Sequence, residues 1–275
     1  GKRAAVRFDG VYMNADFWIN GQYLGNHPYG YTSFEFDLTP HLKPAGQENI
    51  LAVRVRNEGK NSRWYSGSGI FRHVWLTATE PVHVPTWGVF VTTPEVSRDK
   101  AVVKIATEVR NDGSAEADVL VRARVLNSKG KPVQTTESKV RLSGSQTGMI
   151  QQTVYVRSPK LWSPDLPELY SAEIEIAADG KTLDKTSTHF GIRKIEVDAE
   201  NGFRLNGQML KLKGGCLHHD NGPLGSATID RAEERRVELM KANGFNAIRT
   251  SHNPPSPAFL DACDRLGILV IDEAF

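Results

Sequence analysis

Residues 210–275 alternate strand-like and helix-like segments, and this alternation constrains the fold more than any other feature of the chain. The strand-like segments are Leu210–His219, Asn246–His252 and Ile268–Glu273, and Asp230–Lys241 has the pattern of an amphipathic helix. Each strand-like segment ends in charged or imidazole residues, namely His218, His219 and Asp220, then Arg249 and His252, then Asp272 and Glu273. The pattern is typical of the opening of a (β/α)8 TIM barrel, whose active site lies at the carboxyl ends of its strands.

Only three barrel strands precede the last residue, Phe275. A closed barrel takes eight strands and roughly 250 residues. We therefore expect a truncated barrel whose remaining catalytic wall lies in a longer polypeptide.

Residues 1–82 have the pattern of an all-β domain. Asn20-Gly21 between two apolar runs predicts a tight hairpin, because both residues tolerate the positive φ of a type I′ turn. Short runs at this spacing predict a sandwich or jelly roll. The region opens in mid-sheet, so we expect a partial domain with strands missing on its N-terminal side. The runs are residues 5–8, 15–19, 22–24, 33–37 and 50–55.

Residues 83–190 form a second β region, set off by Pro81 and Pro85. Its size and strand rhythm predict an immunoglobulin-like β-sandwich, and the absence of the usual cysteine pair brings it closer to fibronectin-type modules. After Gly191 the pattern changes to β then α, which places the beginning of the barrel domain at residues 191–275. The longer alternating runs of the sandwich are residues 102–109, 118–126, 148–156 and 169–176.

Composition excludes several function classes. A net charge of +2, with 39% hydrophobic and 24% charged residues and no block of like charges, provides no surface for nucleic acid or an anionic membrane. No apolar run approaches ~18 residues, and the first residues lack the apolar segment of a signal peptide. We expect Cys216 and Cys263 to be small buried thiols rather than a disulfide or a metal pair.

Four strings in this order resemble glycoside hydrolase family 2, the family of β-galactosidases, β-glucuronidases and β-mannosidases. They match its sugar-binding jelly roll at Ser68–Trp75, its immunoglobulin-like domain at Leu161–Tyr170, the start of its barrel at Phe190–Glu196 followed by Phe203–Gly207, and its first barrel signature at Asn246–Glu273. Within the family, His218–Gly225 and Arg249–Pro255 look most like the β-galactosidases.

The resemblance implies a retaining exo-β-glycosidase that acts on terminal β-linked sugars without a cofactor. Such enzymes use two glutamates about 5 Å apart, an acid/base and a nucleophile. The resemblance puts both on later strands, beyond Phe275, so we expect no catalytic residue in this chain and no activity from it alone. Glu273 beside Asp272 cannot replace the pair, because adjacent strand residues point to opposite faces. The alternatives are a β-glucuronidase or β-mannosidase of the same family, or a non-catalytic carbohydrate-binding module.

The resemblance also names candidate substrate-binding residues. Arg249 would lie beside the nucleophile and hold it ionised, unless it only ties its strand to a neighbour. His252 would bond sugar hydroxyls, unless loop backbone satisfies it. His218 and Asp220 lie at the mouth of the first strand, where Asp220 would accept hydroxyl hydrogen bonds. Trp64 would stack on a sugar ring, unless it is a core residue of the sandwich.

We expect no metal site. His218, His219, Asp220 and His252 could be read as ligands, but consecutive histidines on a strand diverge and no helical His-x-x-x-His spacing occurs. In the family's best-known β-galactosidases an Asn and an Asp help to hold a sodium ion, and the corresponding positions are Tyr12 and His73 here. An imidazole in place of a carboxylate weakens a site for a hard cation.

The expected partner is an oligosaccharide or glycoside substrate, with no nucleic acid and no membrane. The sequence leaves a homo-oligomer open. For localisation, the periplasm or the cytoplasm of a bacterium both fit the resemblance.

Overall fold

The computed structural model describes residues 1–274, which divide into two compact units. The first unit comprises residues 1–2 and 79–212, and the second comprises residues 3–78 and the segment from Lys213 onward.

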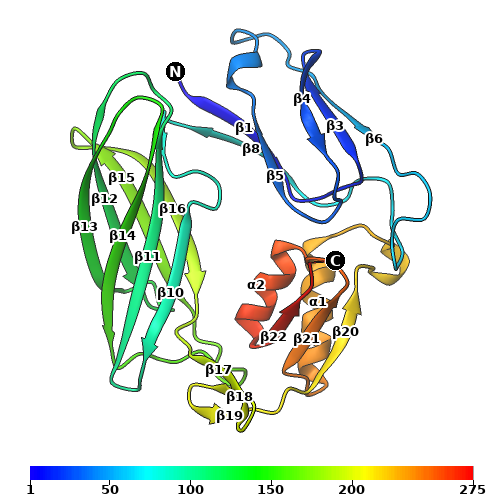
Figure 1. The fold of residues 1–275 in the computed structure, drawn as a ribbon, viewed down its shortest axis with the longest axis vertical. Coiled ribbons are helices and arrows are strands. Elements are labelled where there is room, and N and C mark those ends of the chain that lie inside the picture. Colours follow the sequence, from blue (N-terminus) through cyan, green and yellow to red (C-terminus); the bar gives the residue numbers. More distant parts are fainter. Residues whose placement is uncertain (275) are drawn as a thin grey trace. The chain divides into compact units, whose positions relative to one another are not determined.

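The first unit is built on an antiparallel sandwich (Figure 1). One sheet has the order β10 (Val89–Val96), β11 (Lys100–Asn111), β14 (Gln146–Arg157), and the short β9 (Val82–His83) also pairs with β11. The other has the order β13 (Pro132–Leu142), β12 (Ala117–Leu126), β15 (Tyr170–Ala178), β16 (Lys181–Phe190). Alternate residues of β12 and β14 are buried, as expected when each sheet has one face toward a shared core. The immunoglobulin-like sandwich expected from the sequence is confirmed.

Four strands of this sandwich, β9, β10, β13 and β16, are not among the runs expected from the sequence. β13 and β16 are mostly exposed and rich in Thr, Ser and Lys, so their apolar alternation is weak. A small sheet of β17 (Ile195–Asp198), β18 (Gly202–Leu205) and β19 (Gln208–Met209) completes the first unit. The domain boundaries expected at residues 82/83 and 190/191 stay predictions.

The N-terminal part of the second unit is the jelly-roll region. Its sheets have the orders β5 (Phe34–Asp37), β1 (Arg3–Phe8), β8 (Val74–Thr79) and β4 (Gln22–His27), β3 (Ala15–Ile19), β6 (Leu51–Val55), while β2 (Val11–Tyr12) pairs with β7 (Gly69–Ile70). A 3-10 turn, η1 (Thr39–His41), follows β5. The predicted hairpin joins β3 to β4, with φ of 52° at Asn20 and 82° at Gly21. Phe8 and Phe17 are fully buried at the centre of this core.

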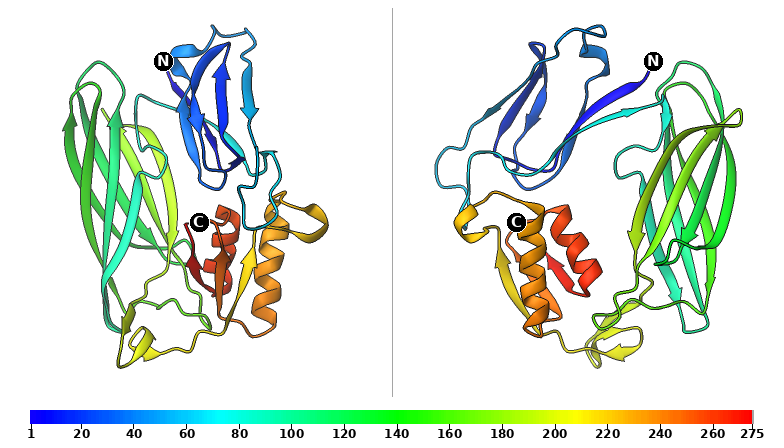
Figure 2. Two further views of the ribbon diagram at one scale, coloured as in Figure 1. Left: turned by 45° about the vertical axis from the view of Figure 1, so that its right-hand side comes forward. Right: turned by 180° about the vertical axis from the view of Figure 1, so that it is seen from behind.

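The C-terminal part of the second unit is the start of the predicted barrel. β20 (Gly214–His218), β21 (Ala247–Ser251) and β22 (Leu269–Asp272) are parallel neighbours in chain order. The helices α1 (Asp230–Ala242) and α2 (Pro257–Leu266) lie side by side against this sheet (Figure 2). Val237, Ile248 and Phe259 form the buried contact between helices and strands. β20 begins at Gly214 rather than at Leu210 as expected.

Short capping signals set the ends of the second helix. The Ser256 hydroxyl accepts a hydrogen bond from the Phe259 N–H, and Pro257 occupies the first turn. Gly267 ends the helix in the left-handed conformation, with φ of 76°. This placement starts β22 at Leu269 and delivers Asp272 and Glu273 to the same end of the sheet as His218 and Ser251. No helix within residues 1–274 is long and apolar enough to cross a membrane.

Truncation of the sandwich core should be costly. Ile174 is fully buried between the sheets, so Ile174→Ala should lower the free energy of unfolding by about 2–5 kcal/mol through lost burial and a residual cavity. Met149→Ala, on the exposed face of β14, should change it by less than about 0.5 kcal/mol. Urea unfolding of each variant measures both. Equal effects of the two substitutions would show that Ile174 contributes no more to the stability of the sandwich core than an exposed residue does.

Candidate active site at the strand ends

Arg249 and His252 converge on one carboxylate at the carboxyl end of the parallel sheet. Arg249 Nε donates to Glu273 Oε1 at 2.6 Å, and a second guanidinium nitrogen forms an ion pair with the same oxygen. His252 Nδ1 lies 3.0 Å from Glu273 Oε2. Arg249 therefore does tie its strand to a neighbouring one, the alternative that the sequence left open. Its role beside a nucleophile stays a prediction.

The two contacts determine the ionisation of Glu273. Burial by itself would raise the pKa of this carboxyl, but the hydrogen bond and charge of Arg249 and the hydrogen bond of His252 outweigh burial and lower the pKa. Glu273 is therefore ionised at neutral pH, and it accepts hydrogen bonds rather than supplying a proton.

Trp64 from the jelly-roll region meets the end of β20. Its indole Nε1 donates to Asp220 Oδ2 at 2.5 Å, and its ring stacks on the His218 ring with centroids 3.9 Å apart. The hydrogen bond from Trp64 lowers the pKa of Asp220, so this carboxylate too is ionised. Trp64 is 41% exposed, so the alternative that it is a core residue of the sandwich is wrong.

His218 joins the two groups of contacts. Its ring lies edge-on to the His252 ring, with centroids 5.2 Å apart. All five residues singled out from the sequence thus lie in one contiguous group with Glu273. We call this group the strand-end cluster; it comprises Trp64, His218, Asp220, Arg249, His252 and Glu273. Their roles in substrate binding stay predictions.

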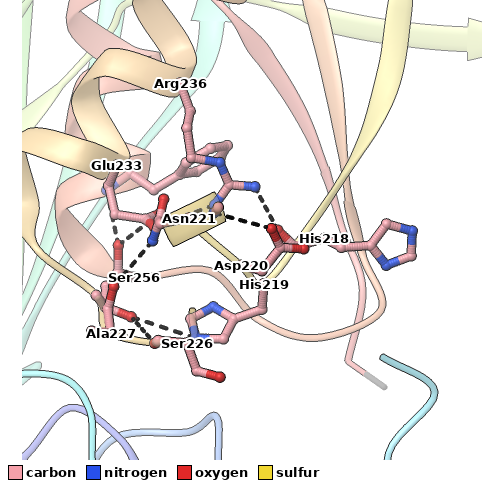
Figure 3. Close-up of polar contacts among 12 residues, drawn as sticks. His218, His219, Asp220, Asn221, Ser226, Ala227, Glu233, Arg236 and Ser256 are labelled. Carbon is pink, nitrogen blue, oxygen red and sulfur yellow. Dashed lines mark hydrogen bonds and ion pairs between the residues drawn. The ribbon is translucent and has the colours of Figure 1, made fainter. Parts of the chain in front are cut away.

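A buried polar network lies next to the end of β20, between that strand end and α1 (Figure 3). Glu233 on α1 is 2% exposed and accepts hydrogen bonds from Asn221 at 2.9 Å and Arg236 at 3.3 Å. Ser256 Oγ donates to its other oxygen at 3.4 Å. Arg236 also donates to the backbone oxygen of His218 at 2.5 Å. The network therefore fixes the end of β20 from behind, and sequence reasoning missed it. The available signal was the position of Glu233 on the apolar face of the helix, four residues before Val237.

His218 and His219 point in different directions (Figure 3). His219 packs edge-on against Tyr31 and Phe71, with centroid distances of 5.2 and 5.0 Å. Burial, followed by the charge of Arg72, lowers the pKa of His219 to about 4. His219 is thus a neutral packing residue, and it points away from His218, as expected for consecutive residues of a strand.

Family models match the chain along nearly its whole length. The sugar binding domain of glycosyl hydrolases family 2 matches residues 1–80, a further family 2 model matches residues 82–193, and the family's TIM barrel domain matches residues 195–275. The chain belongs to glycosyl hydrolase family 2.

Similar proteins carry more than one activity in their names. The chain is 45% identical to Beta-galactosidase BoGH2A of Bacteroides ovatus, covering 100% of this chain and 32% of that protein. It is 39% identical to a putative beta-glucuronidase of Formosa agariphila, covering 100% of this chain and 26% of that protein. A crystal structure of a family 2 member from Bacteroides cellulosilyticus has 51% identity and a TM-score of 0.97, covering 100% of this chain and 38% of the other. The chain thus spans 26% to 38% of these relatives' lengths.

In this family 2 chain, the residues at the two positions compared with a sodium site have protein partners. Tyr12 is buried and its hydroxyl donates to Asn61 Oδ1 at 2.7 Å. His73 Nε2 lies 2.8 Å from Asp230 Oδ1 at the start of α1. Within residues 1–274, no group of three or more His, Cys, Asp or Glu side chains is arranged to hold a metal ion.

The expectation of two buried thiols is half wrong. Cys263 is buried in the α2 packing, and burial raises its pKa to about 12. Cys216 is exposed, because its position on β20 points away from the helices, and Arg249 Nη1 lies 3.5 Å from its sulfur. The alternation of apolar residues along β20 was too weak to indicate this.

The neutral His219 should make stability depend on pH. Its folded pKa of about 4 lies below the unfolded value of about 6.5, so the unfolded state takes up the proton first as the pH falls. The stabilisation is complete above about pH 6.5 and is lost toward pH 4. Lowering the pH from 7 to 5 should therefore reduce the free energy of unfolding by about 2 kcal/mol through this group.

Urea unfolding at both pH values measures this loss. His219→Gln removes the titrating group and should shrink the difference between pH 7 and pH 5 by about that amount. His189→Gln, an exposed imidazole on β16, should keep the wild-type difference. A His219→Gln variant with an unchanged pH dependence would contradict the assignment.

Proposed function

We propose that the polypeptide carrying this chain is a retaining exo-β-glycosidase that removes terminal β-linked sugars, with β-galactosides as its preferred substrates. The observation that carries this proposal is the strand-end cluster. In it Trp64 from the sugar-binding domain contacts His218 and Asp220 at the end of β20. His218 packs against His252, which lies with Arg249 and Glu273 at the ends of β21 and β22. In a (β/α)8 barrel this end is the catalytic one.

The cluster has the chemistry of a sugar site. Two carboxylates, Asp220 and Glu273, accept hydrogen bonds from hydroxyl groups, and His218 and His252 each offer a ring nitrogen for a hydroxyl. Trp64 is stacked by His218 on one face, and its exposed surface provides an apolar platform beside the polar groups. Glu273 does not act as the acid, because Arg249 holds it ionised. The acid/base and the nucleophile are proposed to come from later barrel strands.

The charge of the cluster favours a neutral terminal sugar. The cluster contains two ionised carboxylates, Asp220 and Glu273, and one guanidinium, that of Arg249, which is paired with Glu273, so a negative charge on the terminal sugar would be repelled. This supports a β-galactosidase, in line with the name of the Bacteroides ovatus relative. A β-glucuronidase is the second candidate, supported by the name of the Formosa agariphila relative. A β-mannosidase or a non-catalytic carbohydrate-binding module are the remaining alternatives.

The 275-residue chain by itself should hydrolyse no glycoside. A retaining mechanism needs a proton donor and a nucleophile about 5 Å apart, and the only glutamate at the carboxyl end of a barrel strand, among residues 1–274, is the ionised Glu273. Incubation with aryl β-galactoside, β-glucuronide and β-mannoside measures this. A polypeptide that continues the chain to the length of its relatives should release aryl alcohol fastest from the galactoside. Turnover that co-purifies with the short chain would refute the proposal that the acid/base and the nucleophile come from later barrel strands.

Substitutions in the longer polypeptide test the two basic residues. Arg249→Ala should lower kcat by about a hundredfold, because a preorganised charge partner in an active site is worth this much in the transition state. His252→Ala should lower kcat/KM by about tenfold through the loss of a hydroxyl contact. The matched control is Arg265→Ala, since Arg265 pairs with Glu234 on the helical surface. It should keep the wild-type kcat. A folded Arg249→Ala variant with wild-type kcat would contradict the assignment of the end of β21 to the active site.

A further inference from the structure

A pocket lies beside the strand-end cluster, within the second unit. It has a volume of about 220 Å³, and its lining includes Tyr12, Tyr29, Tyr31, Asn61, Arg63 and Asn253. We call it the tyrosine pocket. His252 belongs to its lining as well as to the cluster, so the two sites adjoin.

The walls of the tyrosine pocket are aromatic and fixed. The Tyr31 ring packs against the rings of Tyr12 and Tyr29, with centroids 5.4 and 5.8 Å apart. Tyr29 donates to Asn253 Oδ1 at 2.8 Å, and burial raises the pKa of its hydroxyl to about 12. Flat aromatic faces next to amide groups suit a sugar ring, which needs both apolar contact and hydrogen bonds.

Arg63 gives the tyrosine pocket a positive charge. No carboxylate lines the pocket, and no ion pair joins Arg63 to a carboxylate anywhere in residues 1–274. Other arginines of this unit are paired, for example Arg54 with Asp16 and Arg265 with Glu234. An exposed arginine that lines a pocket and has no carboxylate partner can form paired, charge-assisted hydrogen bonds with a carboxylate or a sulfate.

The chain sequence couples the pocket to the cluster. Arg63 immediately precedes Trp64, whose indole binds Asp220, so one short segment serves both sites. The two sites also differ in charge, because the cluster has two ionised carboxylates whereas the pocket has a cation. A neutral sugar suits the first and an anionic group suits the second.

We propose that the tyrosine pocket binds a negatively charged sugar residue of the substrate, carrying a carboxylate or a sulfate, next to the neutral terminal sugar in the strand-end cluster. The inference rests on the proposed function for the identity of the ligand as a glycan. Arg63 binds the anionic group, and the tyrosines contact the ring.

Three matched disaccharides test the proposal in the longer polypeptide. They share the terminal sugar, and the second sugar is glucose, glucuronic acid or glucose 6-sulfate. The wild type should prefer at least one anionic disaccharide to the neutral one in kcat/KM, mainly through KM. Arg63→Gln should lower that anionic-to-neutral ratio about tenfold, which is the worth of a charge-assisted hydrogen bond. Arg63→Lys should recover part of it. The anionic compound that responds identifies the group as carboxylate or sulfate.

The control is Arg98→Gln, in the exposed β10–β11 turn of the other unit, which should leave the ratio unchanged. A ratio that Arg63→Gln does not change, or a wild type without preference for either anionic disaccharide, would overturn the proposal. Titration calorimetry with the same disaccharides measures their affinity for the protein independently of turnover. If no glycoside is hydrolysed, the proposed function fails, and the tenfold loss of anionic affinity in Arg63→Gln still decides whether the pocket binds an anionic sugar.

Discussion

The buried guanidinium of Arg72 is the contact on which the arrangement of the second unit depends. It is 7% exposed, and it donates to the backbone oxygens of Tyr31 at 2.9 Å in the jelly-roll region and Pro254 at 2.8 Å in the loop after β21. Burial lowers its pKa to about 10, so it stays charged at neutral pH. A buried charge is tolerated only when it is hydrogen-bonded, and these carbonyls provide the partners. The loop held in this way includes His252 and Asn253, which line the two proposed sugar sites.

A second polar centre holds the same end of the sheet from the helical side. Glu233 on α1 accepts hydrogen bonds from Asn221, Arg236 and Ser256. Arg236 also donates to the backbone oxygen of His218. Arg72 and Glu233 are thus supports that do not face the proposed substrate, while the residues that do face it come from loops and strand ends. Such a division is expected where a precise site is built on a rigid scaffold.

Local sequence signals predicted the fold well because each one has a local physical cause. Asn20-Gly21 tolerates positive φ, and the polar residues after three apolar runs indicated the functional end of a parallel sheet. The same reasoning could not find Arg72, because its partner Pro254 lies 182 residues away in the chain. Glu233 left a local signal on the apolar face of α1, but its partner Ser256 lies 23 residues away and could not be inferred from that signal. It also placed Cys216 in the core, although β20 presents that side chain on the face opposite the helices.

The central claim is that the sugar site is shared between the jelly-roll region and the barrel strands. A double-mutant cycle on Trp64 and Asp220 tests it most directly, with the affinity of the longer polypeptide for galactose as the measured quantity. Trp64→Phe removes the indole donor and Asp220→Asn removes the charge it binds. The account predicts that the two losses of binding free energy are not additive, with a coupling of at least about 0.5 kcal/mol. Additive losses, or wild-type affinity in both single variants, would contradict it.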